Sequence, residues 1–103
     1  MNNSDTRPQI TPEKLEKACR ILKVIAHPVR MSVIELLDKY EQLNVGEIQE
    51  HIEIEQAALS HHLINMKDKG VLQCFRDGKN MVYSLKEKKI VKILDCLSQC
   101  EME

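Results

Sequence analysis

Aromatic residues are scarce in this 103-residue sequence, which has no Trp, two Tyr and one Phe. Its core must therefore be aliphatic, and a single domain of this size buries only a modest core. We expect one small domain that gains stability by pairing with a second copy. No apolar run approaches the roughly 20 residues that a membrane-spanning helix needs, and the polar start over residues 1–9 differs from a signal peptide. These absences predict a cytoplasmic protein with no membrane partner.

Motifs of catalysis and of common metal sites are also missing. The four cysteines, at positions 19, 74, 96 and 100, have no Cys-x-x-Cys spacing, which disfavours a zinc ribbon or a thioredoxin-type site. There is no Gly-rich phosphate loop, no nucleophile motif and no pair of histidines at zinc-ligand spacing. The prediction is that the chain is not an enzyme. The alternative is an enzyme whose catalytic Cys and His are distant in the sequence and come together only in the folded chain.

Neither sign of charge dominates, but the charges are unevenly distributed. The formal net charge is −1, whereas the segment from Met66 to Lys92 carries eight Lys or Arg against three Asp or Glu. The preceding 65 residues carry seven against ten, and the last eleven carry three acids and no Lys or Arg. Screening removes contributions from beyond about 10 Å, so a local positive face can meet phosphates. The alternative is an ordinary solvated face of mixed Lys and Glu.

The first part of the chain predicts two helices. Residues 1–10 are polar and expected to be disordered, and residues 11–103 are expected to form the domain. Thr11 and Pro12 favour a helix start, and this helix is expected to end at His27, because Pro28 disfavours helical geometry in the preceding residue. Pro28 then opens a second helix that stops near Tyr40.

The stretch from Asn44 to Gly70 predicts two short helices joined by a tight turn, after a linking segment over residues 41–43. Asn44 and Glu47 have the spacing of a capping box. The first helix stops near His51, and the second spans about Glu55 to Lys69, with Gly70 as its C-terminal stop. The buried side of the second helix is expected to carry Leu59, Leu63 and Met66.

The other side of this second helix is short-chained, polar and uncharged, as a helix entering a DNA major groove requires. We predict base contacts from Gln56, Ala57, Ser60, His61 and Asn65. Candidate contacts to the DNA backbone are Arg30, Lys67, Arg76 and Lys79. The alternatives are a solvent-exposed face of a core helix and ordinary surface charges. His62 lies about 100° further round the helix and is expected to be packed and hydrogen-bonded.

After Gly70, two runs over residues 71–76 and 80–85 predict strands. Asp77-Gly78 between them favours a tight β-hairpin. A last helix is expected over residues 86–99. The predicted order is therefore four helices, a hairpin and a helix.

Several of these stretches together resemble the ArsR/SmtB family of bacterial winged-helix repressors. They are Ala-Leu-Ser-His-His-Leu at 58–63, Met-Lys-Asp-Lys-Gly-Val-Leu at 66–72, the Ala-x-Pro-x-Arg pattern at 26–30, and a Gly-tipped wing that ends in a Tyr-Ser-Leu-like strand. The resemblance implies a mainly α fold with a β-hairpin wing (α+β), a winged helix-turn-helix. It also implies a homodimeric repressor that binds a pseudo-palindromic double-stranded DNA operator.

In this family the first and last helices form the dimer interface. The matching apolar residues here exceed what one small core encloses: Leu15, Leu22, Ile25, Ile90, Ile93, Leu94 and Leu97. Two alternatives from other classes are a winged helix used only for protein–protein contact and a small thiol-based enzyme or metal carrier.

The effector site follows the family pattern poorly. The Cys-x-Cys pair that metal-sensing members carry at the third helix is absent from residues 43–47, and Lys89 stands where another family site needs a His. No cofactor is required by the sequence. Cys96 and Cys100 share a helix face, and Cys19 lies on the first helix, so the three are candidate thiol sensors for a soft metal ion, arsenite, a persulfide or a disulfide switch. The alternative, favoured for Cys19 and Cys74, is that they are small buried hydrophobes.

Overall fold

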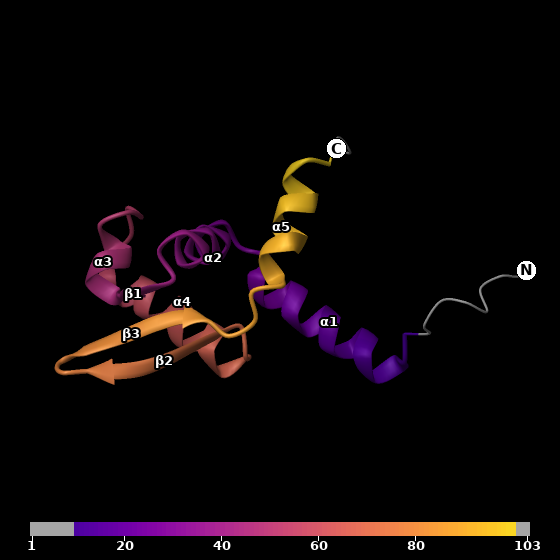
Figure 1. Ribbon diagram of the computed structural model, residues 1–103, viewed down its shortest axis with the longest axis horizontal. Coiled ribbons are helices and arrows are strands. Elements are labelled where there is room, and N and C mark those ends of the chain that lie inside the picture. Colours follow the sequence, from indigo (N-terminus) through magenta and orange to yellow (C-terminus); the bar gives the residue numbers. More distant parts are fainter. Residues whose placement is uncertain (1–9, 101–103) are drawn as a thin grey trace, which may run out of the picture.

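The structure, a computed structural model, describes residues 10–100. Its elements run in the order α1 (Pro12–Ile25), α2 (Pro28–Tyr40), β1 (Gln42–Asn44), α3 (Val45–Gln49), α4 (Gln56–Asp68), β2 (Leu72–Asp77), β3 (Asn80–Leu85) and α5 (Ile90–Ser98) (Figure 1). The predicted winged helix-turn-helix order is confirmed, with one short strand added. Apart from Ile10, the tail predicted to be disordered lies outside the described residues.

The boundary between the first two helices follows from Pro28. The Thr11 side chain caps α1 by accepting a hydrogen bond from the Lys14 backbone N–H at 3.2 Å. We predicted that this helix runs to His27, but it ends at Ile25, and His27 has an extended backbone. The His27 ring nitrogen Nδ1 instead accepts from the Val29 N–H at 3.1 Å, so His27 caps α2.

The sheet has three antiparallel strands in the order β1-β3-β2. Strand β1 was predicted as a plain link, but Leu43 pairs with Tyr83 on β3. The wing is the β2–β3 hairpin, in which Asp77 pairs with Asn80 across the two-residue loop of Gly78 and Lys79. Gly78 has φ +65° at the first loop position, as a type II′ turn requires.

The core is aliphatic, as predicted. It joins the inner faces of α2, α3 and α4 to the sheet and to the ends of α1 and α5 that adjoin it. Its most buried side chains are Ile25, Val33, Ile34, Leu37, Ile48, Leu59, Leu63, Met66 and Leu72. Tyr83 is buried with them, whereas Tyr40 and Phe75 are exposed.

Helix α5 begins four residues later than predicted. The Lys86 N–H donates to the Val71 carbonyl oxygen at 3.1 Å, which holds Lys86 to the start of β2, and α5 begins at Ile90. Among residues 10–100, no helix combines the length and apolar character that crossing a membrane requires.

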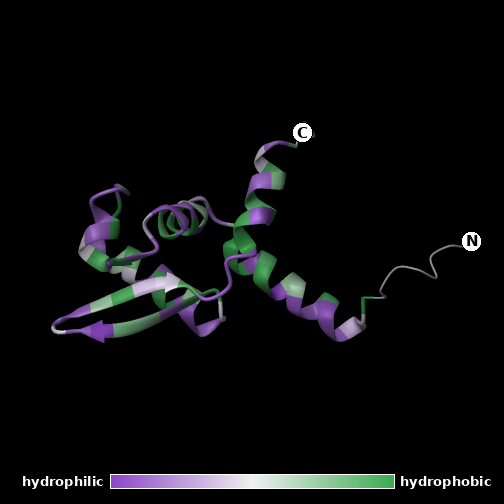
Figure 2. Ribbon diagram, in the orientation of Figure 1, coloured by the Kyte–Doolittle hydropathy of each residue, from purple (hydrophilic) through white to green (hydrophobic). Residues whose placement is uncertain are grey.

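Helices α1 and α5 project from the end of the molecule opposite the wing tip (Figure 1). Both carry apolar residues along their length (Figure 2). Of the residues predicted for the dimer interface, four are exposed: Leu15 by 51%, Leu22 by 43%, Ile93 by 40% and Leu97 by 56%. The other three are buried in the core of the single chain, which removes them from the set available to a partner: Ile25, Ile90 and Leu94.

Candidate nucleic-acid interface

Helices α3 and α4 form a compact pair because local hydrogen bonds fix both ends of α3. The Asn44 side chain accepts from the Glu47 N–H, the Glu47 carboxylate accepts from the Asn44 N–H, and both distances are 2.8 Å. This is the predicted capping box. At the other end, the Gln49 side-chain amide donates to the Ile54 carbonyl oxygen at 3.0 Å, which closes the turn that leads into α4.

Helix α4 ends at Gly70 in a Schellman motif. The Gly70 N–H donates to the Lys67 carbonyl oxygen at 3.0 Å, and the Val71 N–H donates to that of Met66 at 2.9 Å. Gly70 has φ +85°, a conformation that L side chains rarely adopt. The predicted stop is confirmed, and it turns the chain directly into β2.

The two faces of α4 differ as the sequence predicts. Leu59, Leu63 and Met66 are fully buried against the core. On the opposite side Gln56, Ala57 and His61 are exposed, and Ser60 and Asn65 are half-buried. The residues predicted to contact bases therefore lie together along one open side of a single helix, although Asn65 is also engaged within the chain.

Arg30, in the first turn of α2, ties α4 to α2 and to the end of α1. Its Nε donates to Nδ1 of His62, and its Nη1 donates to Oδ1 of Asn65, both at 3.0 Å. Nη1 also donates to the Val24 carbonyl oxygen near the end of α1, again at 3.0 Å. Two of the three guanidinium nitrogens thus bond within the chain, and the carbonyl oxygen of Asn65 is committed to Arg30. Contact of Arg30 with the DNA backbone and contact of Asn65 with a DNA base stay predictions.

His62 is packed and hydrogen-bonded, as predicted. Because its Nδ1 accepts from Arg30, the ring is neutral, with its proton on Nε2. Burial lowers the pKa of His62, and the charges of Arg30, His27 and His61 lower that pKa further. The His27 and His62 ring centroids are 4.5 Å apart, so His27 completes the packing around this node.

The cationic side chains predicted to contact the DNA backbone, apart from Arg30, lie on the wing and at the end of α4. Arg76 lies near the exposed end of β2 and Lys79 lies in the hairpin loop, and both side chains are exposed. Lys67, in the last turn of α4, is exposed as well. The two strands of the wing are paired along their length, and the Gln73 side-chain amide of β2 also donates to the Ser84 hydroxyl of β3 at 3.3 Å. These positions are open to a phosphate backbone, and that contact stays a prediction.

Comparison with known proteins agrees with this arrangement. Residues 25–74 match the family described as "Helix-turn-helix domain". The chain is 34% identical over 97 residues to the biofilm growth-associated repressor of Xylella fastidiosa (strain 9a5c). The alignment covers 90% of this chain and 84% of that repressor. The chain belongs to the ArsR/SmtB family.

Solved structures of relatives share the fold over most of their length. The transcriptional repressor PagR of Bacillus anthracis superposes with a TM-score of 0.76 at 33% identity, over 84% of this chain and 99% of PagR. Reduced HlyU from Vibrio cholerae N16961 superposes with a TM-score of 0.75 at 27% identity, over 85% of this chain and 95% of HlyU. This ArsR/SmtB protein is a DNA-binding transcriptional repressor. Its membership also confirms that it is not an enzyme.

The cysteines of this repressor are more open than predicted. Cys19, Cys96 and Cys100 are exposed, so the interpretation of Cys19 as a buried hydrophobe is wrong within one chain. Cys74 is half-buried and packs against the core beside its strand partner Tyr83, in agreement with that interpretation. Within residues 10–100, no three His, Cys, Asp or Glu side chains gather closely enough to hold a metal ion. Residues 101–103 lie outside the described residues.

The sequence did not lead us to predict the cluster in which Arg30 donates hydrogen bonds to His62, Asn65 and Val24, which we call the Arg30 node. Its signal was present in the sequence, because His62 and Asn65 are three residues apart and therefore share one side of α4. What the spacing could not show is that Arg30, more than 30 residues earlier, opens α2 facing that side.

Proposed function

We propose that this repressor binds a pseudo-palindromic operator as a homodimer, with one α4 in the major groove of each half-site. The observation that carries the proposal is the open side of α4, where Gln56, Ala57, Ser60 and His61 offer short polar or methyl groups beside a fully buried apolar side. Such groups match the donors, acceptors and methyls that base edges present in the major groove.

The wing extends this surface toward the DNA backbone. Arg76 and Lys79 are placed by the hairpin, and Lys67 by the last turn of α4, so each is a candidate phosphate contact. Phosphate contacts fix the register of the protein on the duplex but carry no sequence information. In this division of roles α4 selects the operator and the wing contributes affinity.

Dimerisation follows from the apolar side chains that one chain leaves exposed. Leu15 and Leu22 on α1, with Ile93 and Leu97 on α5, are the residues we assign to the interface. Two copies joined there would present two α4 helices to successive half-sites, about 34–36 Å apart along the DNA.

The experiment compares Ser60→Ala/His61→Ala with His51→Ala, a matched control that removes an exposed histidine outside α4. The double variant should lose its preference for operator over random DNA, because each lost base contact costs about 1–3 kcal/mol. Fluorescence anisotropy with both DNAs measures the ratio, and thermal melting checks the fold. If the folded double variant keeps the wild-type ratio, the assigned side of α4 is wrong.

We further propose that the signal acts through Cys100, with Cys96 or Cys19 as partner. All three thiols are exposed, and they belong to the α1 and α5 regions assigned to the dimer interface, so a second copy could bring them together where one chain does not. Joining thiols there by a soft ion or a sulfur bridge would favour one relative orientation of the two α4 helices.

The test titrates the operator complex with arsenite, zinc and a persulfide donor. Wild type should release DNA with arsenite or persulfide, Cys100→Ser should not, and Cys74→Ser, which removes the half-buried thiol, should behave as wild type. Release by zinc alone, or equal release from wild type and Cys100→Ser, would refute the thiol proposal without affecting the operator proposal.

A further inference from the structure

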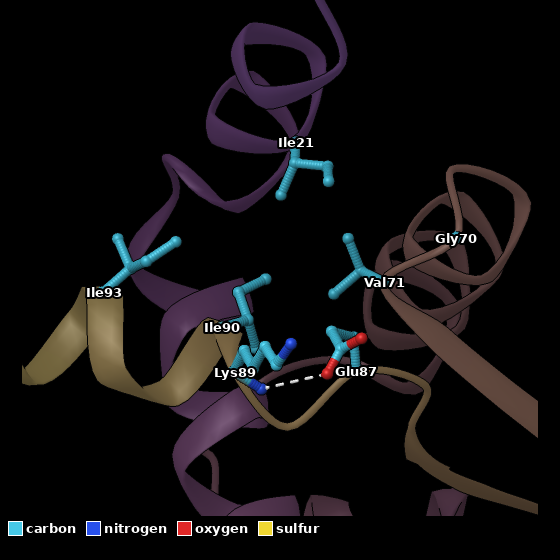
Figure 3. A pocket seen from close by; sticks show the side chains of 7 residues that line it. All are labelled: Ile21, Gly70, Val71, Glu87, Lys89, Ile90 and Ile93. Carbon is cyan, nitrogen blue, oxygen red and sulfur yellow. Dashed lines mark hydrogen bonds between the residues drawn. The ribbon is translucent and has the colours of Figure 1, made fainter. Parts of the chain in front are cut away.

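A small apolar pocket lies where α1, α5 and the start of β2 meet (Figure 3). Its volume is about 130 Å³, and its walls are the side chains of Ile21, Val71, Ile90 and Ile93. Glu87 and Lys89 lie along one edge, where the Glu87 carboxylate accepts from the Lys89 backbone N–H at 3.4 Å. The pocket is comparable in size to an apolar cavity of about 150 Å³ that holds benzene, so it has room for roughly six carbon atoms.

A second hollow of about 460 Å³ adjoins the apolar pocket and shares Ile21, Gly70 and Glu87 with it. Its other walls are cationic: Lys17, Arg20, Lys69 and Lys86. Four cations against the single carboxylate of Glu87 give this hollow a positive balance. Lys and Arg side chains are the usual partners of carboxylate and phosphate groups.

We propose that the two hollows form one binding site for a small anionic amphiphile. Its apolar tail, of about six to eight carbons, occupies the Ile21–Val71–Ile90–Ile93 pocket. Its single anionic head lies against Lys17 and Arg20 on α1. Burying the tail supplies most of the affinity, and the cations select the sign of the head. The site uses neither the open side of α4 nor the three exposed thiols, but it shares Ile93 with the residues that we assign to the dimer interface.

The position of this site connects it to the reading helix. Gly70, shared by both hollows, is the residue that ends α4, and Val71 completes the Schellman motif there. The opposite walls come from α1 and α5. A bound amphiphile would therefore contact both the end of α4 and the pair of helices assigned to the dimer.

The test uses the full chain labelled at isoleucine δ1 methyl groups and follows their NMR shifts. Octanoate and octyl phosphate distinguish a carboxylate from a phosphate head, and octylammonium carries the same tail with the opposite charge. We expect at least one of the two anions to shift Ile21, Ile90 and Ile93 saturably below its micelle concentration, and octylammonium not to do so. Saturable shifts by all three compounds, by none, or at methyls such as Ile48 and Ile64 instead, would overturn the proposal.

Variants on one helix separate the head contact from general charge. Lys17→Gln/Arg20→Gln removes two cations that line the hollow, and Lys14→Gln/Lys23→Gln removes two that do not, with the same change in net charge. The first pair should weaken binding of the anion about tenfold, as expected for two partly exposed ionic contacts. The second pair should leave affinity within about twofold, as expected for charges that contact nothing in the site. Equal weakening by both pairs would show that no defined head site exists.

Discussion

The α3–α4 pair and the α1/α5 end of this repressor are packed in opposite ways. Helix α4 buries three large side chains completely and is held by the Arg30 node, the closed α3–α4 turn and the Schellman motif. Helices α1 and α5 instead leave Leu15, Leu22, Ile93 and Leu97 exposed. The difference shows that contacts within residues 10–100 fix the position of α4, whereas they leave part of the apolar surface of α1 and α5 uncovered, and we propose that a second copy covers it.

The largest expected effect comes from the same substitution made in each region. Leu63→Ala in α4 should lower the free energy of unfolding by about 2–5 kcal/mol, because it opens a cavity in a closed core. Leu97→Ala removes the same atoms from an exposed position, so its effect should be small for a monomer and appear as weaker dimerisation. Chemical denaturation at two protein concentrations measures both. A concentration-independent loss for Leu97→Ala as large as that for Leu63→Ala would remove the contrast between the regions.

A second comparison asks whether Arg30 holds α4 or contacts DNA. Arg30→Gln should destabilise the fold by about 1–3 kcal/mol, since His62 and Asn65 lose a charged donor. It should leave the salt dependence of DNA binding unchanged. Arg76→Gln on the wing should do the reverse, reducing the slope of log K against log salt by about 0.9 with little effect on stability. Anisotropy titrations from low to moderate salt give both slopes, and a reduced slope for Arg30→Gln would make Arg30 a phosphate contact.

The smallest effect concerns pH. The pKa of His62 is lowered by burial and by Arg30, so the folded chain binds a proton there less readily than the unfolded chain, whose histidine has a pKa of about 6.5. The stability contributed by neutral His62 is therefore present above about pH 6.5 and is lost as the pH falls through the lower folded value. His62→Gln should flatten the fall in denaturation midpoint between about pH 7.5 and 5. His51→Gln, which lies away from Arg30, should keep the wild-type curve, and equal curves for wild type and His62→Gln would contradict the assignment.

Much of the fold was predictable because its signals are local. The capping box of Asn44 and Glu47, the glycine stop at Gly70 and the hairpin at Gly78 each depend on residues within five positions of one another. Strand β1 was missed because three residues become a strand only by pairing with β3, almost 40 positions later. The late start of α5 has a similar cause, since Lys86 is held by Val71 across the sheet.

The candidate site was predictable only in part. Helical periodicity identified the open side of α4 and the buried Leu59, Leu63 and Met66. It could not show that the Asn65 carbonyl oxygen is engaged by Arg30, because that contact joins separate helices. Exposure of Cys19 was equally hidden, since an apolar stripe does not reveal which part of a helix extends beyond the core.

Asn44 belongs to two structures at once. Its backbone pairs with Val82 on the wing strand β3, while its side chain caps α3. The wing is thus linked through β3 and β1 to the start of the α3–α4 pair, and we expect the wing and this pair to move as one stiff body. We expect such a body to adapt little to the DNA, and the duplex to supply most of the bending needed for α4 and the wing to engage together. The affinity for different operators would then depend on how easily the base steps that the protein does not contact can be deformed.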